Sequence, residues 1–328
     1  MINIRNPSKE HIIKMKKHFE RLKRNKKIKH CLHPDKNNCK GKIIRAHSIQ
    51  NKRVLEKISE NGTVYMPISN TGNPFELIGE YGRRVATTFT GFCDYHDKMF
   101  QPIEINNFSS DNEEQIFLYI YRAFIFDYHQ KLELKKQYEQ NQLVDERLKL
   151  LSIGNLLALH DLEDDKKYFD RAILDKDYNI LKYIVWKFHQ PIKFAATGLL
   201  SPEEDLDGNF IQSVADESNQ LEHLYFSVFP EELSSYIIMA YLDKGKNIFD
   251  GLFKQLVTLN YQQKKNFTNY VIIKGTDNLA INPKAWNNTS EIFKESFRYN
   301  FKEFEEFFEI PKEKGHQISK MQFDLFEL

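Results

Sequence analysis

All three cysteines of this 328-residue chain lie in one short part of the sequence, and histidines stand beside them. Cys31 lies between His30 and His33, Cys39 follows eight positions later, and Cys93 precedes His96 by three. An odd number of cysteines, in a sequence without an apolar secretory leader, argues against a disulfide framework. This clustering favours a shared metal ion.

Structural zinc sites use four Cys or His ligands, commonly supplied as two close pairs. Cys93 and His96 form a C-x2-H pair, and Cys31 and Cys39 form a second, widely spaced pair. We therefore predict that these four residues bind a structural Zn2+. The two histidines that flank Cys31 remain possible replacements for one of the ligands.

The segment from about residue 30 to 102 contains many Gly, Asn and Thr residues and only short apolar runs, such as "KIIRAHSI", "GTVYMPIS" and "RRVATTFTGF". This pattern is typical of a small, irregular domain with short strands. Such a domain has a thin hydrophobic core, and a bound metal is a common way to stabilise it.

The motifs "IRAHSIQ" and "GFCDYHDKMF" resemble the HNH, or ββα-metal, endonucleases over about residues 30 to 105. In that family a first cysteine pair precedes a strand with the catalytic His, and a second strand leads into the remaining zinc ligands and a metal-binding residue on a helix. His47 matches the catalytic His, Cys93 and His96 match the second zinc pair, and Asp97 matches the metal-binding residue.

Three features depart from the family pattern. The zinc pairs differ, because the first is widely spaced and the second has His96 in place of a Cys. Ala46 stands where many members carry a metal-binding Asp. The middle Asn of the family name has no clear counterpart: the corresponding position falls on Thr88, and the other candidates are Asn51, Asn70 and Asn73. Because Mg2+ keeps several waters and binds substrate phosphates, a site with few protein carboxylates can still be active.

The resemblance implies an enzyme that hydrolyses phosphodiester bonds. His47 is then the general base that accepts a proton from the attacking water. Asp97 would hold a catalytic Mg2+ or Mn2+, which stabilises the developing charge. The enzyme would thus use two metals with separate roles, a structural zinc and a catalytic hard cation.

The charge of the chain is divided unevenly. Residues 1–60 contain eighteen Lys and Arg against five Asp and Glu, a net charge of +13, so the remainder carries −12 in a chain of net charge +1. Residues 8–29 show apolar positions at helical spacing among many lysines, which predicts a basic amphipathic helix. We expect nucleic acid, DNA rather than RNA, to bind at these basic side chains: Lys23, Arg24, Lys26, Lys27, Arg45 and Lys98.

The pattern along the chain predicts an α+β protein, with a small zinc-stapled ββα-metal domain followed by a larger helical and mixed α+β body. The expected divisions are a basic helix at 1–29, the HNH-like domain at 30–108, a long helical connection at 109–164 and an α+β domain of unknown role at 165–328. Within the last part we expect strands at "YNILKYIVWKF", "LEHLYFSVF" and "SSYIIMAYLD", the last two joined as a hairpin, and a helix at "NIFDGLFKQLVTL".

Two other functions compete with the metal-dependent nuclease. Arg122 and His129 lie seven positions apart in a helical pattern, a spacing that resembles the metal-independent HEPN ribonucleases. Alternatively, the chain is a zinc-stapled module that binds nucleic acid or a partner without catalysis. We also expect a cytoplasmic protein without a membrane segment, a protein partner or self-association through the acidic body and, by analogy alone, a role in anti-phage defence.

Overall fold

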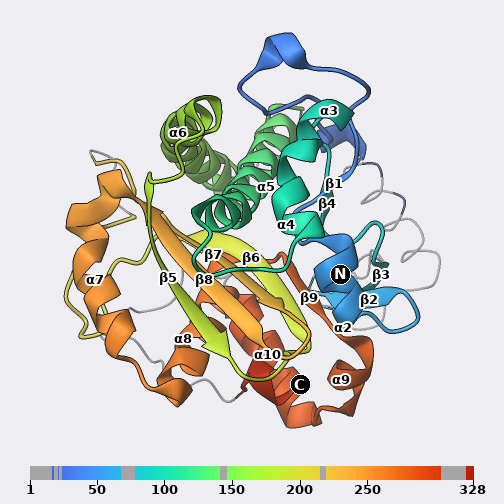
Figure 1. Ribbon diagram of the computed structural model, residues 1–328, viewed down its shortest axis with the longest axis vertical. Coiled ribbons are helices and arrows are strands. Elements are labelled where there is room, and N and C mark those ends of the chain that lie inside the picture. The colour runs from blue at the N-terminus through green and yellow to red at the C-terminus, as the bar shows by residue number, and fades with distance from the viewer. Residues whose placement is uncertain are drawn as a thin grey trace.

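The computed structural model describes residues 17, 21, 24–67, 78–140, 146–214, 219–303 and 323–328. The described residues form a mixed α+β structure (Figure 1). Most of the expected basic helix at 8–29, including Lys23, lies outside the described residues; within it, Lys17, Arg21 and residues 24–26 are helical. No helix among the described residues is both long and apolar enough to cross a membrane.

A seven-stranded antiparallel sheet occupies the centre of the fold, with the strand order β3-β2-β9-β6-β7-β8-β5. Its strands are β2 (Thr63–Met66), β3 (Gly79–Gly82), β5 (Leu181–Phe188), β6 (Phe194–Leu200), β7 (Leu224–Pro230), β8 (Ser235–Leu242) and β9 (Leu279–Ile281).

The expected hairpin is confirmed, since β7 and β8 pair in antiparallel register with Pro230 opposite Ser235. Every residue of β7 is buried. Because side chains alternate along a strand, Tyr225 and Phe229 enter the core on one face, and Phe226 and Val228 enter the core on the other. Both faces of the sheet are therefore covered.

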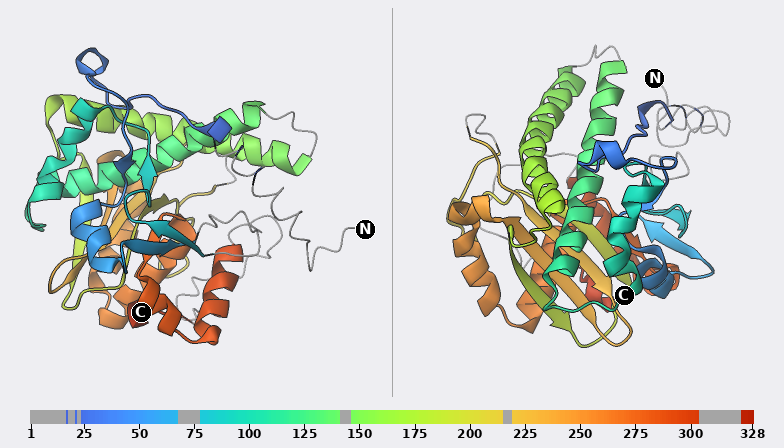
Figure 2. Two further views of the ribbon diagram at one scale, coloured as in Figure 1. Left: turned by 90° about the vertical axis from the view of Figure 1, so that its right-hand side faces the viewer. Right: turned by 45° about the horizontal axis from the view of Figure 1, so that its top comes forward.

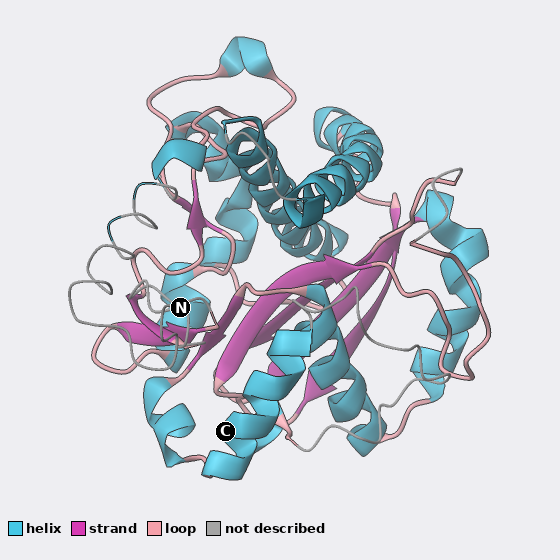
Figure 3. Ribbon diagram, turned by 180° about the vertical axis from the view of Figure 1, so that it is seen from behind, coloured by secondary structure: helices cyan, strands magenta, loops and turns pink. Residues whose placement is uncertain are grey.

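Helices cover the two faces as separate layers (Figures 1 and 3). On one face lie α5 (Glu113–Gln140) and α6 (Glu146–Asp175), which run side by side (Figure 2). The other face is covered by a C-terminal set of helices: α7 (Lys246–Thr258), α8 (Tyr261–Gly275) and α10 (Glu291–Glu303). The predicted helix at "NIFDGLFKQLVTL" is confirmed as α7. The short α9 (Pro283–Asn288) follows β9.

The part that carries the Cys and His residues is built from short elements. A two-stranded antiparallel sheet pairs β1 (Ala46–His47) with β4 (Thr88–Phe89). After β4 the chain forms three consecutive helical segments: α3 (Asp94–Asp97), η3 (Lys98–Phe100) and α4 (Gln101–Ile105). Three further short helical segments precede β2: η1 (Lys36–Asn38), η2 (Asn51–Leu55) and α2 (Glu56–Ile58).

The large sheet crosses two of the expected domain boundaries. Strands β2 and β3 fall within the expected domain at 30–108, yet β2 pairs with β9 through Tyr65 and Ile281. Helix α6 continues beyond residue 164 to Asp175. One hydrophobic core contains Cys31 and Cys93 together with Tyr225 of the large sheet. The expected boundary at residue 108 is therefore not a boundary of the sheet or of the core.

Candidate metal centre and neighbouring site

Cys93 and His96 are brought together by the first turn of α3. Cys93 is the residue that caps the amino end of α3, and His96 lies three positions further on, so both side chains share one helix face. The segment that contains Cys31 reaches the same point because the Leu32 N–H donates to the Gly91 carbonyl at 2.7 Å. A bridge between Ile43 and Cys93 aligns the returning chain.

Cys39 arrives through a structured loop. The seven residues between Cys31 and Cys39 contain η1, whose first turn is capped by the Asp35 side chain accepting from the Asn38 N–H. The Cys39 N–H donates to the Lys36 carbonyl, which closes the turn. The loop thus folds back on itself and returns Cys39 to the position of Cys31.

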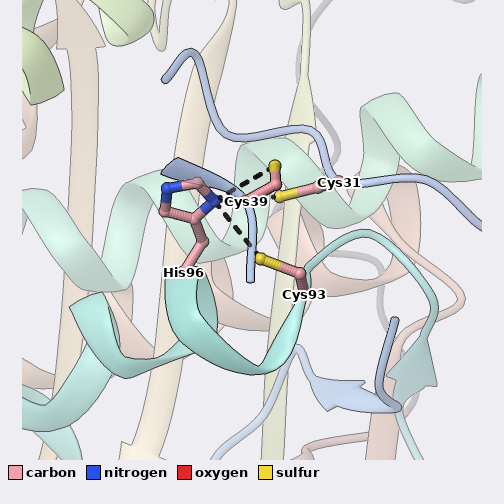
Figure 4. A group of neighbouring side chains, drawn as sticks. All are labelled: Cys31, Cys39, Cys93 and His96. Carbon is pink, nitrogen blue, oxygen red and sulfur yellow. Dashed lines mark hydrogen bonds between the residues drawn. The ribbon is translucent and has the colours of Figure 1, made fainter. Parts of the chain in front are cut away.

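The four predicted ligands converge on one point (Figure 4). The sulfur atoms of Cys31, Cys93 and Cys39 lie 3.3, 3.4 and 3.6 Å from Nδ1 of His96. A neutral ring nitrogen offers one proton or one lone pair, so it cannot satisfy three thiols by hydrogen bonding. Sulfur and nitrogen ligands of one tetrahedral zinc lie about 3.5 Å apart. The geometry is therefore compatible with zinc.

The surroundings of the cluster shift the pKa values of two of its thiols. Burial raises the pKa of Cys39 to about 11, and the neighbouring thiols of Cys31 and Cys93 raise it too. Burial also raises the pKa of Cys93, but N–H groups of His96 and Lys40 outweigh it and bring the value below its ordinary level. A cation bound at this cluster would favour the thiolate form, which is the form that binds metal.

The two alternative ligands lie outside this group. His33 stacks its ring on that of His96, with the ring centroids 3.8 Å apart and the planes 7° from parallel. Nδ1 of His33 accepts the Asp35 N–H at 3.1 Å. His30 is exposed. Among the described residues, the cluster that could hold a metal consists of Cys31, Cys39, Cys93 and His96.

His47 lies on β1, opposite Thr88 on β4. Nε2 of His47 is 3.2 Å from the Arg83 carbonyl, and a carbonyl only accepts, so Nε2 carries the proton. In the neutral ring Nδ1 is then the nitrogen with a free lone pair. Burial lowers the pKa of His47, although the hydrogen bond to Arg83 opposes this. The ring is therefore neutral at neutral pH.

Asp97 follows His96 directly on α3. One of its carboxylate oxygens, Oδ1, is buried and has no hydrogen-bond partner among the described residues. Burial raises the Asp97 pKa, and the Arg122 charge opposes that rise. An unsatisfied buried oxygen requires an explanation, and a bound cation or ordered water would supply one.

Ala46 is buried, with 2% of its surface exposed, so no carboxylate is present at the position that many family members use. The Thr88 hydroxyl donates to the Val85 carbonyl at 2.8 Å. Asn51 accepts a hydrogen bond from Arg83, whose carbonyl holds His47. Asn70 and Asn73 lie outside the described residues.

Two residues near this site were not predicted as part of it. Arg122 on α5 is 2% exposed and pairs with Glu104 on α4, with Nη2 and Oε1 2.5 Å apart. The charges of both residues influence the pKa of His47 and of Asp97. Glu104 lies seven positions after Asp97 in consecutive helical segments. This spacing of about two helical turns is the sequence signal that could have placed Glu104 near Asp97. Arg122 comes from a distant helix, so no spacing rule could place it.

The competing Arg122 and His129 pair is buried in α5. Arg122 also lies over the ring of Phe100, with Cζ 4.1 Å from the ring centroid. His129 instead packs edge to face on Phe89, with ring centroids 5.3 Å apart. Because both side chains are enclosed by the core, this geometry gives no support to a site that must admit RNA.

The described basic side chains expected to bind nucleic acid are accessible. Arg24, Lys27, Arg45 and Lys98 are exposed, and Lys26 is half-buried. Arg45 precedes β1 and Lys98 follows Asp97, so the two flank the site in sequence.

Comparison with known proteins gives no match: no family model, no curated protein and no solved structure is significantly similar to this chain.

Proposed function

We propose that the protein is a metal-dependent endonuclease of the HNH type, with a structural zinc at Cys31, Cys39, Cys93 and His96. The observation that carries the proposal is the order of local elements. An antiparallel pair of strands, β1 and β4, holds His47, and α3 follows with Asp97 directly after a cluster suited to zinc. This is the strand-strand-helix arrangement that the sequence resemblance implies.

In this proposal the zinc has a structural role. Four protein ligands fill a tetrahedral site and leave no open position for substrate. The cluster joins the loop before β1 to the start of α3, so it fixes the two elements that carry His47 and Asp97. Catalysis then takes place beside the zinc rather than on it.

The proposed chemical step is hydrolysis with His47 as the general base. Nδ1 of His47 takes a proton from water, the water oxygen attacks phosphorus, and the bond from phosphorus to the leaving oxygen breaks. The hydrogen bond from Nε2 to the Arg83 carbonyl holds the ring in the tautomer that this step needs. A Mg2+ or Mn2+ held by Asp97 would stabilise the charge on the phosphate.

The proposed substrate is nucleic acid, with DNA favoured. The exposed side chains of Arg45 and Lys98, beside β1 and after Asp97, provide positive charge for the phosphate backbone. Arg122, Glu104 and Asp97 together carry one negative charge when ionised. A divalent cation and one phosphodiester group would bring that sum to zero, so the electrostatics of the site are consistent with a cation bound together with substrate.

The test is the substitution His47→Ala, compared with His160→Ala, which changes an exposed histidine on α6. Full-length protein is incubated with plasmid DNA, single-stranded DNA and RNA in Mg2+ or Mn2+. We expect H47A to lose about 10²- to 10⁴-fold in cleavage rate while keeping its zinc, and H160A to cut as the unchanged protein does.

Equal cleavage by H47A would contradict the role of His47. If the unchanged protein contained zinc and bound nucleic acid but did not cleave it, the result would instead support the non-catalytic module. Cleavage of RNA without added metal would support the ribonuclease alternative. Each of these outcomes rejects the proposed function.

A further inference from the structure

The orientation of His96 poses a specific structural problem. Its Nδ1 faces the three sulfur atoms, so the proton of the neutral ring must be on Nε2. Zinc-bound histidines almost always donate this second N–H to a carboxylate, carbonyl or water, which fixes the ring. Here Nε2 is buried and has no hydrogen-bond partner among the described residues. Two neighbouring rings contact the His96 ring instead, Tyr95 edge to face with the centroids 5.1 Å apart and His33 face to face.

The stacked ring of His33 makes the closer of these two contacts. His33 is 9% exposed and His96 is 4% exposed, so the stack is enclosed by protein. A centroid separation of 3.8 Å with planes 7° from parallel is a face-to-face contact over most of the ring. Such a contact restricts rotation of the His96 ring about its bond to the helix.

His33 is itself fixed by the loop that carries Cys39. Its Nδ1 accepts the Asp35 N–H, and the Asp35 side chain caps η1, which leads directly into Cys39. The stack therefore connects the widely spaced cysteine pair to the histidine on α3. A tight knuckle of two to four residues would leave no room for such a side chain between the cysteines.

We propose that His33 is a positioning residue of the metal centre, which stacks on His96 and holds its Nδ1 toward the bound ion. The inference rests on the structural zinc of the proposed function and is independent of nuclease activity. His33 binds no metal in this role; it reduces the freedom that His96 must lose when the ion binds.

The experiment measures zinc release from the zinc-loaded full-length protein into an excess of chromogenic chelator. His33→Ala removes the stack, whereas His33→Phe keeps a flat ring and removes the ring nitrogens. His30→Ala is the matched control, because it changes the exposed histidine on the other side of Cys31. We expect H33A to release zinc about 10- to 100-fold faster, with H33F and H30A close to the unchanged protein.

A second readout separates positioning from ligation. Co2+ is substituted for zinc, and its visible spectrum reports the number and kind of ligands. We expect the same spectrum for the unchanged protein, H33F and H33A, because the four ligands are retained in all three. A changed spectrum in H33F would make His33 a ligand and overturn the proposal.

Two further results would also overturn it. If H33A released zinc at the rate of the unchanged protein, the stack would not contribute to zinc retention. If H33F and H33A released zinc equally fast, the faster release would be due to loss of the ring nitrogens rather than of the stack. If the unchanged protein bound no zinc, the structural-zinc part of the proposed function would fail as well. Absence of nuclease activity alone would leave the role of His33 intact.

Discussion

Burial shifts the pKa values of individual side chains in this protein, and His129 is an example. His129 is enclosed in α5, and burial lowers its pKa to about 4. Glu133 lies 4.0 Å from it, but burial raises the pKa of that carboxyl. A neutral imidazole forms no ion pair, so His129 acts at neutral pH as a polar member of the core that packs on Phe89.

We expect His129 to lower the stability of the protein in acid. Its pKa is about 4 when folded and 6.5 in the unfolded chain, so the unfolded chain takes up the proton first as the pH falls. The contribution of His129 to the free energy of unfolding is fully present above its pKa in the unfolded chain. It is lost as the pH falls toward its pKa in the folded protein, by about 3 kcal/mol between about pH 7 and pH 4. Urea unfolding at both pH values measures this.

The variant His129→Leu should lose this share of the pH dependence. The comparison isolates His129, because His33 also has a pKa lowered to about 4 and contributes equally in both proteins. An identical loss of unfolding free energy in the variant and the unchanged protein would show that His129 is not the group responsible.

At the scale of elements, a buried polar cluster joins α6 to the sheet. Asp165 on α6 is fully buried and accepts hydrogen bonds from His223, at 2.6 Å, and from Tyr225 on β7. Lys244, just after β8, lies 2.9 Å from the same carboxylate and 3.1 Å from Glu222. Burial raises the Asp165 pKa, but these partners outweigh it and hold the pKa below its ordinary value.

We expect Asp165→Ala to destabilise the protein by about 3 to 5 kcal/mol, because the buried donors of His223 and Tyr225 would lose their acceptor and Lys244 its closest counter-charge. Glu163→Gln is the control on the same helix, since Glu163 is exposed, and it should change stability by less than about 0.5 kcal/mol. Chemical denaturation of both variants gives the two values. Similar small losses in both would mean that the cluster does not hold α6 on the sheet.

Helices and strands with long, regular patterns were predictable from the sequence, whereas short ones were not. The β7–β8 hairpin has two apolar runs with a short polar loop, and the pairing follows from that local pattern. Strand β9 has three residues, and its neighbours β2 and β6 lie far away in sequence. Nothing local specifies such a pairing, because it depends on how the rest of the chain has packed.

At the scale of the whole molecule, the metal centre belongs to the same core as the large sheet. Cys31 and Cys93 share one hydrophobic core with α5 and with Tyr225 and Ile238 of the sheet. A change at the candidate metal centre should therefore reach the core on this face of the sheet. This coupling contrasts with the separate small domain expected from the sequence.

Removal of the metal should accordingly lower the temperature of one cooperative unfolding transition. Calorimetry of the full-length protein before and after chelation measures it, and Cys93→Ser should behave as the chelated protein does, because Cys93 is one of the four proposed zinc ligands. A new, separate transition at low temperature in the metal-free protein would show instead that the Cys and His region unfolds by itself.

The sequence by itself pointed to Cys31, Cys39, Cys93 and His96 with His30 and His33 as alternatives, to the order of His47 and Asp97 around them, and to the main strands and helices of the C-terminal part. Residue type limits metal ligation to few side chains, and local periodicity specifies regular elements. Only the tertiary structure decided that His33 stacks on His96, that β2 joins the large sheet, and that Glu104 and Arg122 stand beside the site. These contacts join residues whose sequence spacing carries no signal, because packing of the core brings them together.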